Sequence, residues 1–186
     1  MFAHLTVLDL AERVARANGQ GQSGNDYWIR VFRNLHTASI LPAASYRGHG
    51  RTAAALYDHY GLCLAGIAAT LTRVYRLEPQ AMREALPVIR SAGVASADSI
   101  AKAVRGATLQ QAVDGVRHGQ TWHLHLVMMD AAPAVRMVAQ FRQPGESSGK
   151  LPPGLEAAVS DATTARSAGE IILNLNHVLA PYLDEG

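Results

Sequence analysis

Apolar residues recur at helical spacing through the first 90 residues of the chain. Residues 6–18 carry one such stripe, formed by Val7, Leu10, Ala11 and Val14. Spacings of three and four residues put these side chains on one face of an α-helix. Thr6 can cap this helix, because Asp9 follows three residues later in an acidic variant of the capping box. Residues 19–24, rich in glycine and polar side chains, predict a loop after it.

A second helix is predicted over residues 27–35, with Asn25 or Asp26 as its cap. Its apolar positions are Trp28, Ile29, Phe32 and Leu35. The pattern predicts four further helices, over residues 59–75, 78–91 (bent or divided at Pro87), 96–105 and 108–116 (capped by Thr108).

The spacing changes from helical to alternating after residue 120. Residues 121–129 place Trp122, Leu124 and Leu126 on one side, which predicts a strand with one buried face. Residues 135–141 predict a second, antiparallel strand, and a third is predicted over 170–176, before a short closing helix over 177–183. Residues 143–154 predict a loop, and 155–165 favour helix. We therefore expect an α+β fold, with a first domain over 1–76 and a helical plus β region over 77–186.

Charge is distributed unevenly along the chain. The 186 residues carry a formal net charge of +2. Residues 1–76 hold eight arginines and four acids, a balance of +4, and the remainder holds nine bases and eleven acids, a balance of −2. The basic excess lies in the predicted N-terminal domain, as phosphate binding would require.

Cysteine and apolar content limit the classes of site and location. Cys63 is the single cysteine of the chain, which excludes an intramolecular disulfide and a multi-thiolate metal site. We interpret it as a core residue of its helix. No signal-peptide pattern and no apolar run of membrane-spanning length occurs, so we expect a cytoplasmic protein without membrane association.

Motifs of nucleophilic catalysis and of phosphate-cradling loops do not occur in the sequence, so we expect no enzymatic activity and predict no cofactor. His123 and His125 form an H-x-H pair on the predicted strand. Alternate strand residues point the same way, so the pair could hold a metal if a third ligand such as His118 or Asp130 joined it. We favour the other interpretation, two polar side chains on the wetter face of the sheet, and predict no metal site.

The stretch over residues 26–58 combines a helix and a basic turn. Arg30 and Arg33 alternate with the apolar positions of the helix, so burying its apolar side turns both arginines outward. An apolar exit at residues 40–42 leads to the turn RGHGR over 47–51, where two glycines permit positive φ. This layout is typical of a winged helix-turn-helix. A two-helix hairpin of a helical bundle, followed by a basic surface loop, is the alternative.

The residues over 4–72 resemble the DNA-binding domain of MerR-type regulators and of related excisionase-like winged helices. The matching features are LT, LA, IR, the exit ILP, the turn RGHGR, LYD and L-x-x-I, in that order along the chain. The turn over residues 19–25 is longer than the tight turn of that family, and prolines 79 and 87 interrupt the region where a dimerisation helix would follow. We therefore expect a divergent relative that dimerises by other means.

The resemblance implies a homodimer that binds double-stranded DNA. It places Arg30 in the reading helix and Tyr57 in or near the wing, as the likelier of two tyrosines, Tyr46 and Tyr57, to contact phosphate. The predicted DNA-binding residues are Arg30, Arg33, Asn34, Arg47, His49, Arg51 and Tyr57. Trp28 is interpreted as a core residue.

These features predict a sequence-specific transcriptional regulator whose C-terminal region dimerises and binds a small-molecule or protein effector. Two alternatives stay open. One is an excisionase-like architectural factor that bends DNA, and the other is a ligand- or metal-binding module that uses the C-terminal sheet.

Overall fold

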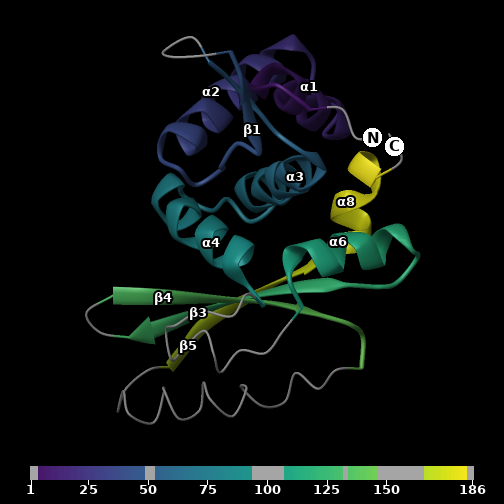
Figure 1. Ribbon diagram of the computed structural model, residues 1–186. Helices are drawn as coiled ribbons and strands as arrows, with labels where there is room; N and C mark the ends of the chain where they lie inside the picture. The colour runs from purple at the N-terminus through teal and green to yellow at the C-terminus, as the bar shows by residue number, and fades with distance from the viewer. Residues whose placement is uncertain (1–3, 49–52, 94–106, 132–133, 146–165, 184–186) are drawn as a thin grey trace. The chain divides into compact units, whose positions relative to one another are not determined.

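The computed structural model describes residues 4–48, 53–93, 107–131, 134–145 and 166–183, without the side chains of 129–131, 134–136 and 166–168. These parts of the chain form six α-helices and two small antiparallel sheets, so the α+β class is confirmed (Figure 1). Within them, no helix is long and apolar enough to cross a membrane. The helices predicted over 96–105 and 155–165, and most of the loop over 143–154, lie outside the described residues.

The chain divides into two compact units. Residues 1–86 and 178–186 form unit 1, and residues 87–177 form unit 2. The first division falls within helix α4 (Pro79–Ser91), at Pro87, and the second falls within helix α8 (Leu175–Leu183). Unit 1 therefore combines the start of the chain with its last residues.

Unit 1 begins with helix α1 (Val7–Ala17), which has the predicted cap. The Thr6 side chain accepts from the Asp9 backbone N–H, and the Asp9 carboxylate accepts from the Thr6 backbone N–H at 2.7 Å. This reciprocal pair satisfies two backbone donors that the first helical turn would otherwise leave open. Leu10, Ala11 and Val14 are buried, so the predicted apolar stripe faces the core.

Helix α2 (Gln22–Thr37) begins five residues before the predicted start. The prediction of a loop over residues 19–24 is therefore partly wrong, and the turn after α1 spans only residues 18–21. The Gln20 side chain closes this turn, because its Oε1 accepts from Trp28 Nε1 at 2.7 Å. Gly24 lies under the same side chain, where an added Cβ would meet Gln20 Cβ at 2.4 Å. The glycine thus allows a close approach that a sequence pattern does not reveal.

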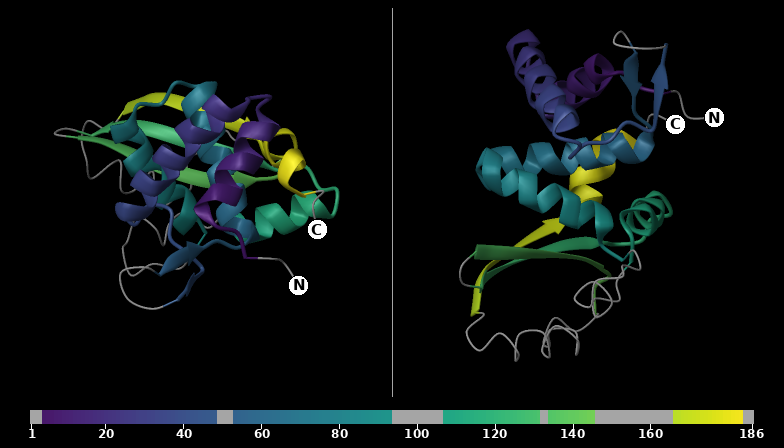
Figure 2. Two further views of the ribbon diagram at one scale, coloured as in Figure 1. Left: turned by 90° about the horizontal axis from the view of Figure 1, so that it is seen from above. Right: turned by 60° about the vertical axis from the view of Figure 1, so that its left-hand side comes forward.

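A two-stranded hairpin follows α2. Strands β1 (Ser45–Arg47) and β2 (Ala54–Leu56) are antiparallel (Figures 1 and 2). The Tyr57 backbone continues the hairpin by bridging to Leu5. The Leu5 N–H donates to Tyr57 O at 2.8 Å, and the Tyr57 N–H donates to Leu5 O at 2.7 Å. No residue of β1 or β2 is fully buried. The N-terminal segment therefore fixes the base of the hairpin.

Helix α3 (His59–Arg73) supplies much of the core of unit 1. Asp58 caps it, and ten of its fifteen residues are buried, including Cys63 at 0% exposure. The interpretation of Cys63 as a core residue is confirmed. Gly66 gives room to Tyr182 of α8, since an added Cβ would lie 2.3 Å from Tyr182 Cε2.

Unit 2 contains helix α6 (Leu109–Arg117) and a three-stranded antiparallel sheet. Strands β3 (His123–Ala131), β4 (Ala134–Arg142) and β5 (Arg166–Asn174) have the order β4-β3-β5. Helix α6, capped by Thr108 as predicted, lies along one face of the sheet (Figures 1 and 2). Leu124 and Leu126 are fully buried, as the alternating pattern predicts.

Candidate nucleic-acid interface

Helix α2 has one buried and one exposed face. The buried residues are Gly24, Trp28, Phe32 and Leu35. The Trp28 and Phe32 rings stack with centroids 5.5 Å apart, and both are 0% exposed, so the interpretation of Trp28 as core is confirmed. We call the opposite face the α2 stripe, made of the exposed residues Asp26, Tyr27, Arg30, Arg33, Asn34 and Thr37.

Three of the predicted contact residues lie together on the α2 stripe. Arg30 precedes Arg33 by three residues and Asn34 by four, so the side chains are neighbours on the helix surface. In the part of the chain that the structure describes, neither guanidinium forms an ion pair. Arginine and asparagine carry paired donors or acceptors that match the edges of guanine and adenine.

Tyr27 also lies on the α2 stripe, and the sequence reasoning missed it. Its side chain is 43% exposed, and its ring meets Trp28 edge-on with centroids 4.9 Å apart. The signal was available, because Tyr27 stands three residues before Arg30 on the same helical face.

The hairpin places one predicted basic residue in solvent. Arg47 is exposed at the end of β1, next to Tyr46, which is 60% exposed. Gly48 follows with φ of 92°, the positive value that the glycine-rich turn predicts. His49 and Arg51, also predicted to contact DNA, lie outside the described residues.

The prediction that Tyr57 contacts phosphate is wrong for this structure. Tyr57 is 0% exposed, and its buried hydroxyl has no hydrogen-bond partner among the residues that the structure describes. Burial raises the pKa of Tyr57 to about 12, and the nearby Tyr46 adds to the rise. The backbone pairing with Leu5 holds the residue at the inner end of the hairpin, so its ring belongs to the core. Of the two tyrosines considered, Tyr46 is the accessible one.

The excess of positive charge in unit 1 lies in the segment that contains α1, α2, the hairpin and α3. Residues 77–86 and 178–186, which complete the unit, add one arginine and four acids to the +4 of residues 1–76. Unit 1 as a whole is therefore close to neutral. Attraction to a polyanion would depend on where the arginines lie, not on the total charge.

The histidine pair of the sheet has a different arrangement from the predicted one. His125 is only 8% exposed, and its Nδ1 lies 2.7 Å from Glu170 Oε1 across the β3–β5 pairing. The His123 ring lies 6.4 Å from the His125 ring, centroid to centroid. The described side chains contain no group of three or more histidine, cysteine, aspartate or glutamate residues that could hold a metal. His125 is thus a buried partner of Glu170, whereas a wet sheet face was expected for both histidines.

No protein-family model, no curated protein and no solved structure matches this chain.

Proposed function

We propose that the protein is a sequence-specific, DNA-binding transcriptional regulator that acts as a homodimer. In this proposal unit 1 is a divergent winged helix-turn-helix of MerR-like type. Helix α1 and the turn over residues 18–21 support α2 as the reading helix, and β1 and β2 form the wing. Unit 2 would dimerise and receive a small-molecule or protein effector.

The observation that carries the proposal is the α2 stripe. A helix packed through Trp28 and Phe32 leaves Arg30, Arg33 and Asn34 in solvent on its other side. A reading helix needs this division, since base edges are read by exposed side chains of a helix that the rest of the domain holds in place.

The turn between α1 and α2 adds support. The sequence suggested a turn too long for the MerR-like arrangement, but the described turn spans only residues 18–21 and is closed by Gln20. The hairpin that follows carries Arg47 in solvent, where a wing would meet the flanking phosphates.

Selection of bound fragments from random duplex DNA tests the proposal with the full chain. We expect an enriched motif in the form of an inverted repeat, because a two-fold symmetric dimer reads two half-sites. The selected site should bind at least about a thousandfold more tightly than random duplex at the same salt concentration. Failure to enrich any motif, together with equal affinity for all duplexes, would refute a sequence-specific regulator. Enrichment of a motif with a large bend and no response to effectors would instead favour the architectural factor.

A further inference from the structure

His36 connects the reading helix to the wing in unit 1. It lies in the last turn of α2 and is half-buried. Its ring centroid lies 6.1 Å from that of Tyr46 in β1 and 6.0 Å from that of Tyr57, which follows β2. One side chain of α2 therefore contacts the beginning and the end of the hairpin.

A third contact of His36 holds the segment between helix and hairpin. The His36 Nδ1 atom lies 3.3 Å from the carbonyl oxygen of Leu41, within the apolar exit. Ile40 and Leu41 are themselves buried, at 5% and 1% exposure. The exit is thus fixed by its own packing, whereas the hairpin beyond it depends on contacts at its base.

The hairpin cannot hold its orientation alone. Each strand has three residues, none of them fully buried, and isolated two-stranded hairpins are at best marginally stable in water. Its base is held by the Leu5–Tyr57 bridge, by the Ala44 N–H that donates to Leu56 O, and by the rings around His36. Of these contacts, those of the His36 ring are the ones that join the hairpin directly to α2, because His36 is a residue of that helix.

We infer that His36 is a positioning residue, which fixes the wing against the reading helix so that both reach the same DNA duplex. The inference rests on the proposed function. His36 would act through Arg47 and would not touch DNA, because its side chain is engaged with Tyr46, Tyr57 and the Leu41 carbonyl.

Salt titrations of DNA affinity test this role in the full chain, on the duplex selected from random DNA. Each phosphate contact contributes a slope of about −0.9 in log affinity against log salt. We expect His36→Ala to reduce the magnitude of this salt slope by about as much as Arg47→Ala does. The double variant His36→Ala/Arg47→Ala should reduce it no further than either single variant. His36→Phe keeps an aromatic ring between Tyr46 and Tyr57 and should restore most of the slope. An unchanged slope in His36→Ala, or additive losses in the double variant, overturns the inference.

Amide hydrogen exchange supplies a second measurement without DNA. His36→Ala should speed exchange of the Ala44 amide, which donates to Leu56 O at the hairpin, while leaving the Leu10 and Val14 amides of α1 unchanged. Equal exchange in wild type and variant overturns the inference, even if DNA affinity falls.

Should His36→Ala fail to fold, the comparison is made between His36→Phe and His36→Gln, of which only the former keeps the aromatic ring. Wild-type protein in the same titration separates the two proposals, because absence of wild-type binding refutes the proposed function itself.

Discussion

Helices α2 and α3 have almost the same length, 16 and 15 residues, but different surroundings. Four residues of α2 are buried, all on one side, whereas ten residues of α3 are buried, including every position from 62 to 69. The two helices belong to the same unit and follow each other in the chain, with the apolar exit and the hairpin between them. The difference shows that α3 is mainly a core helix, whereas α2 keeps one face, the α2 stripe, in solvent, as the proposed function requires.

This contrast separates two kinds of substitution. A change in or against α3 should act through the free energy of unfolding, since it alters packing that the unit cannot replace. A change on the α2 stripe should leave unfolding almost unaltered and act on binding.

The largest expected effect is a loss of folding free energy at alkaline pH, which acts on the core around α3. Burial is the main cause that raises the pKa of Tyr57 and of Tyr182 to about 12, from the ordinary value of 10.0. Between pH 10 and 12 the unfolded chain would lose these protons while the folded chain keeps them, so stability is retained below pH 10 and falls as the pH rises through this window. The loss is at most about 2–3 kcal/mol per tyrosine.

Urea unfolding at pH 9, 10 and 11 measures this effect. Tyr57→Phe and Tyr182→Phe should each flatten the fall, because phenylalanine has no proton to lose. An exposed tyrosine that does not act on either buried ring provides the control, and Tyr27→Phe should leave the pH dependence unchanged. Identical pH profiles for all four proteins would show that neither buried tyrosine titrates abnormally.

Gly66→Ala should destabilise unit 1 by about 1–3 kcal/mol, the usual range for overpacking a core. The added Cβ would lie 2.3 Å from Tyr182 Cε2, so the α8 ring or the α3 backbone must move. Gly21→Ala is the matched control, because an added Cβ there meets nothing within 4 Å. Thermal unfolding should separate the two variants, and equal stabilities would mean that the α3–Tyr182 contact is loose.

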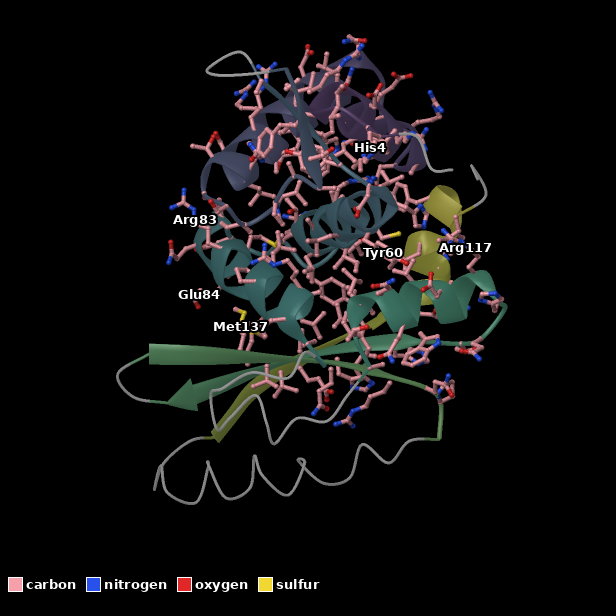
Figure 3. All side chains as sticks on the ribbon, in the orientation of Figure 1. His4, Tyr60, Arg83, Glu84, Arg117 and Met137 are labelled. Atoms are coloured by element: carbon pink, nitrogen blue, oxygen red, sulfur yellow. The ribbon has the colours of Figure 1, made fainter. Side chains whose placement is uncertain are left out.

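Arg30→Ala should reduce affinity for the selected DNA site by about 1–3 kcal/mol and leave thermal unfolding unchanged. Arg83→Ala is the matched control. Arg83 is an exposed arginine of unit 1 that projects from α4 beside Glu84, so its removal changes the net charge equally (Figure 3). If both variants lose the same affinity, on specific and random DNA alike, Arg30 contributes only charge and does not read sequence.

Arg47→Ala should have a smaller and less selective effect. Loss of one phosphate contact lowers the slope of log affinity against log salt by about 0.9, for specific and random duplexes alike. Fluorescence titrations over a range of salt concentrations would measure both slopes. A loss confined to the selected site would assign Arg47 to base reading and contradict the proposed role of the hairpin.

Tyr57→Phe should have the smallest effect at neutral pH. The Tyr57 hydroxyl is buried and has no hydrogen-bond partner in the described part of the chain, so its removal should raise stability by up to about 1 kcal/mol and leave DNA affinity unaltered. Chemical unfolding and DNA titration of the same preparation test both halves. A loss of DNA affinity would instead support the phosphate contact that the sequence suggested for this hydroxyl.

Local patterns predicted the elements of this fold well. The capping pair Thr6–Asp9, the alternation over 121–129 and the glycine turn at 48 each depend on near neighbours, and each is present. The start of α2 was missed because the Gln20 side chain, in the turn before the helix, packs against Gly24 in the first helical turn. A side chain at position 24 would not leave room for this contact. Glycine has a low helix propensity, so the three glycines of residues 19–24 favour a loop when the sequence is read alone.

Some residues of the candidate site could likewise be predicted from local sequence, and others could not. The exposed positions of Arg30, Arg33 and Asn34 follow from helical spacing, so the sequence was sufficient to predict them. The burial of Tyr57 follows from its pairing with Leu5, 52 positions earlier in the chain, and no local pattern contains that information. His36 was missed for a similar reason, because its partners Tyr46 and Tyr57 become neighbours only when the hairpin closes.

The packing of Tyr182 against Gly66 affects how this protein can be dissected. A fragment ending near residue 76, where the sequence places the domain boundary, would lack the aromatic ring that fills the space beside Gly66 and would expose apolar surface of α3. Such a fragment would be prone to aggregation, and its behaviour would say little about DNA binding.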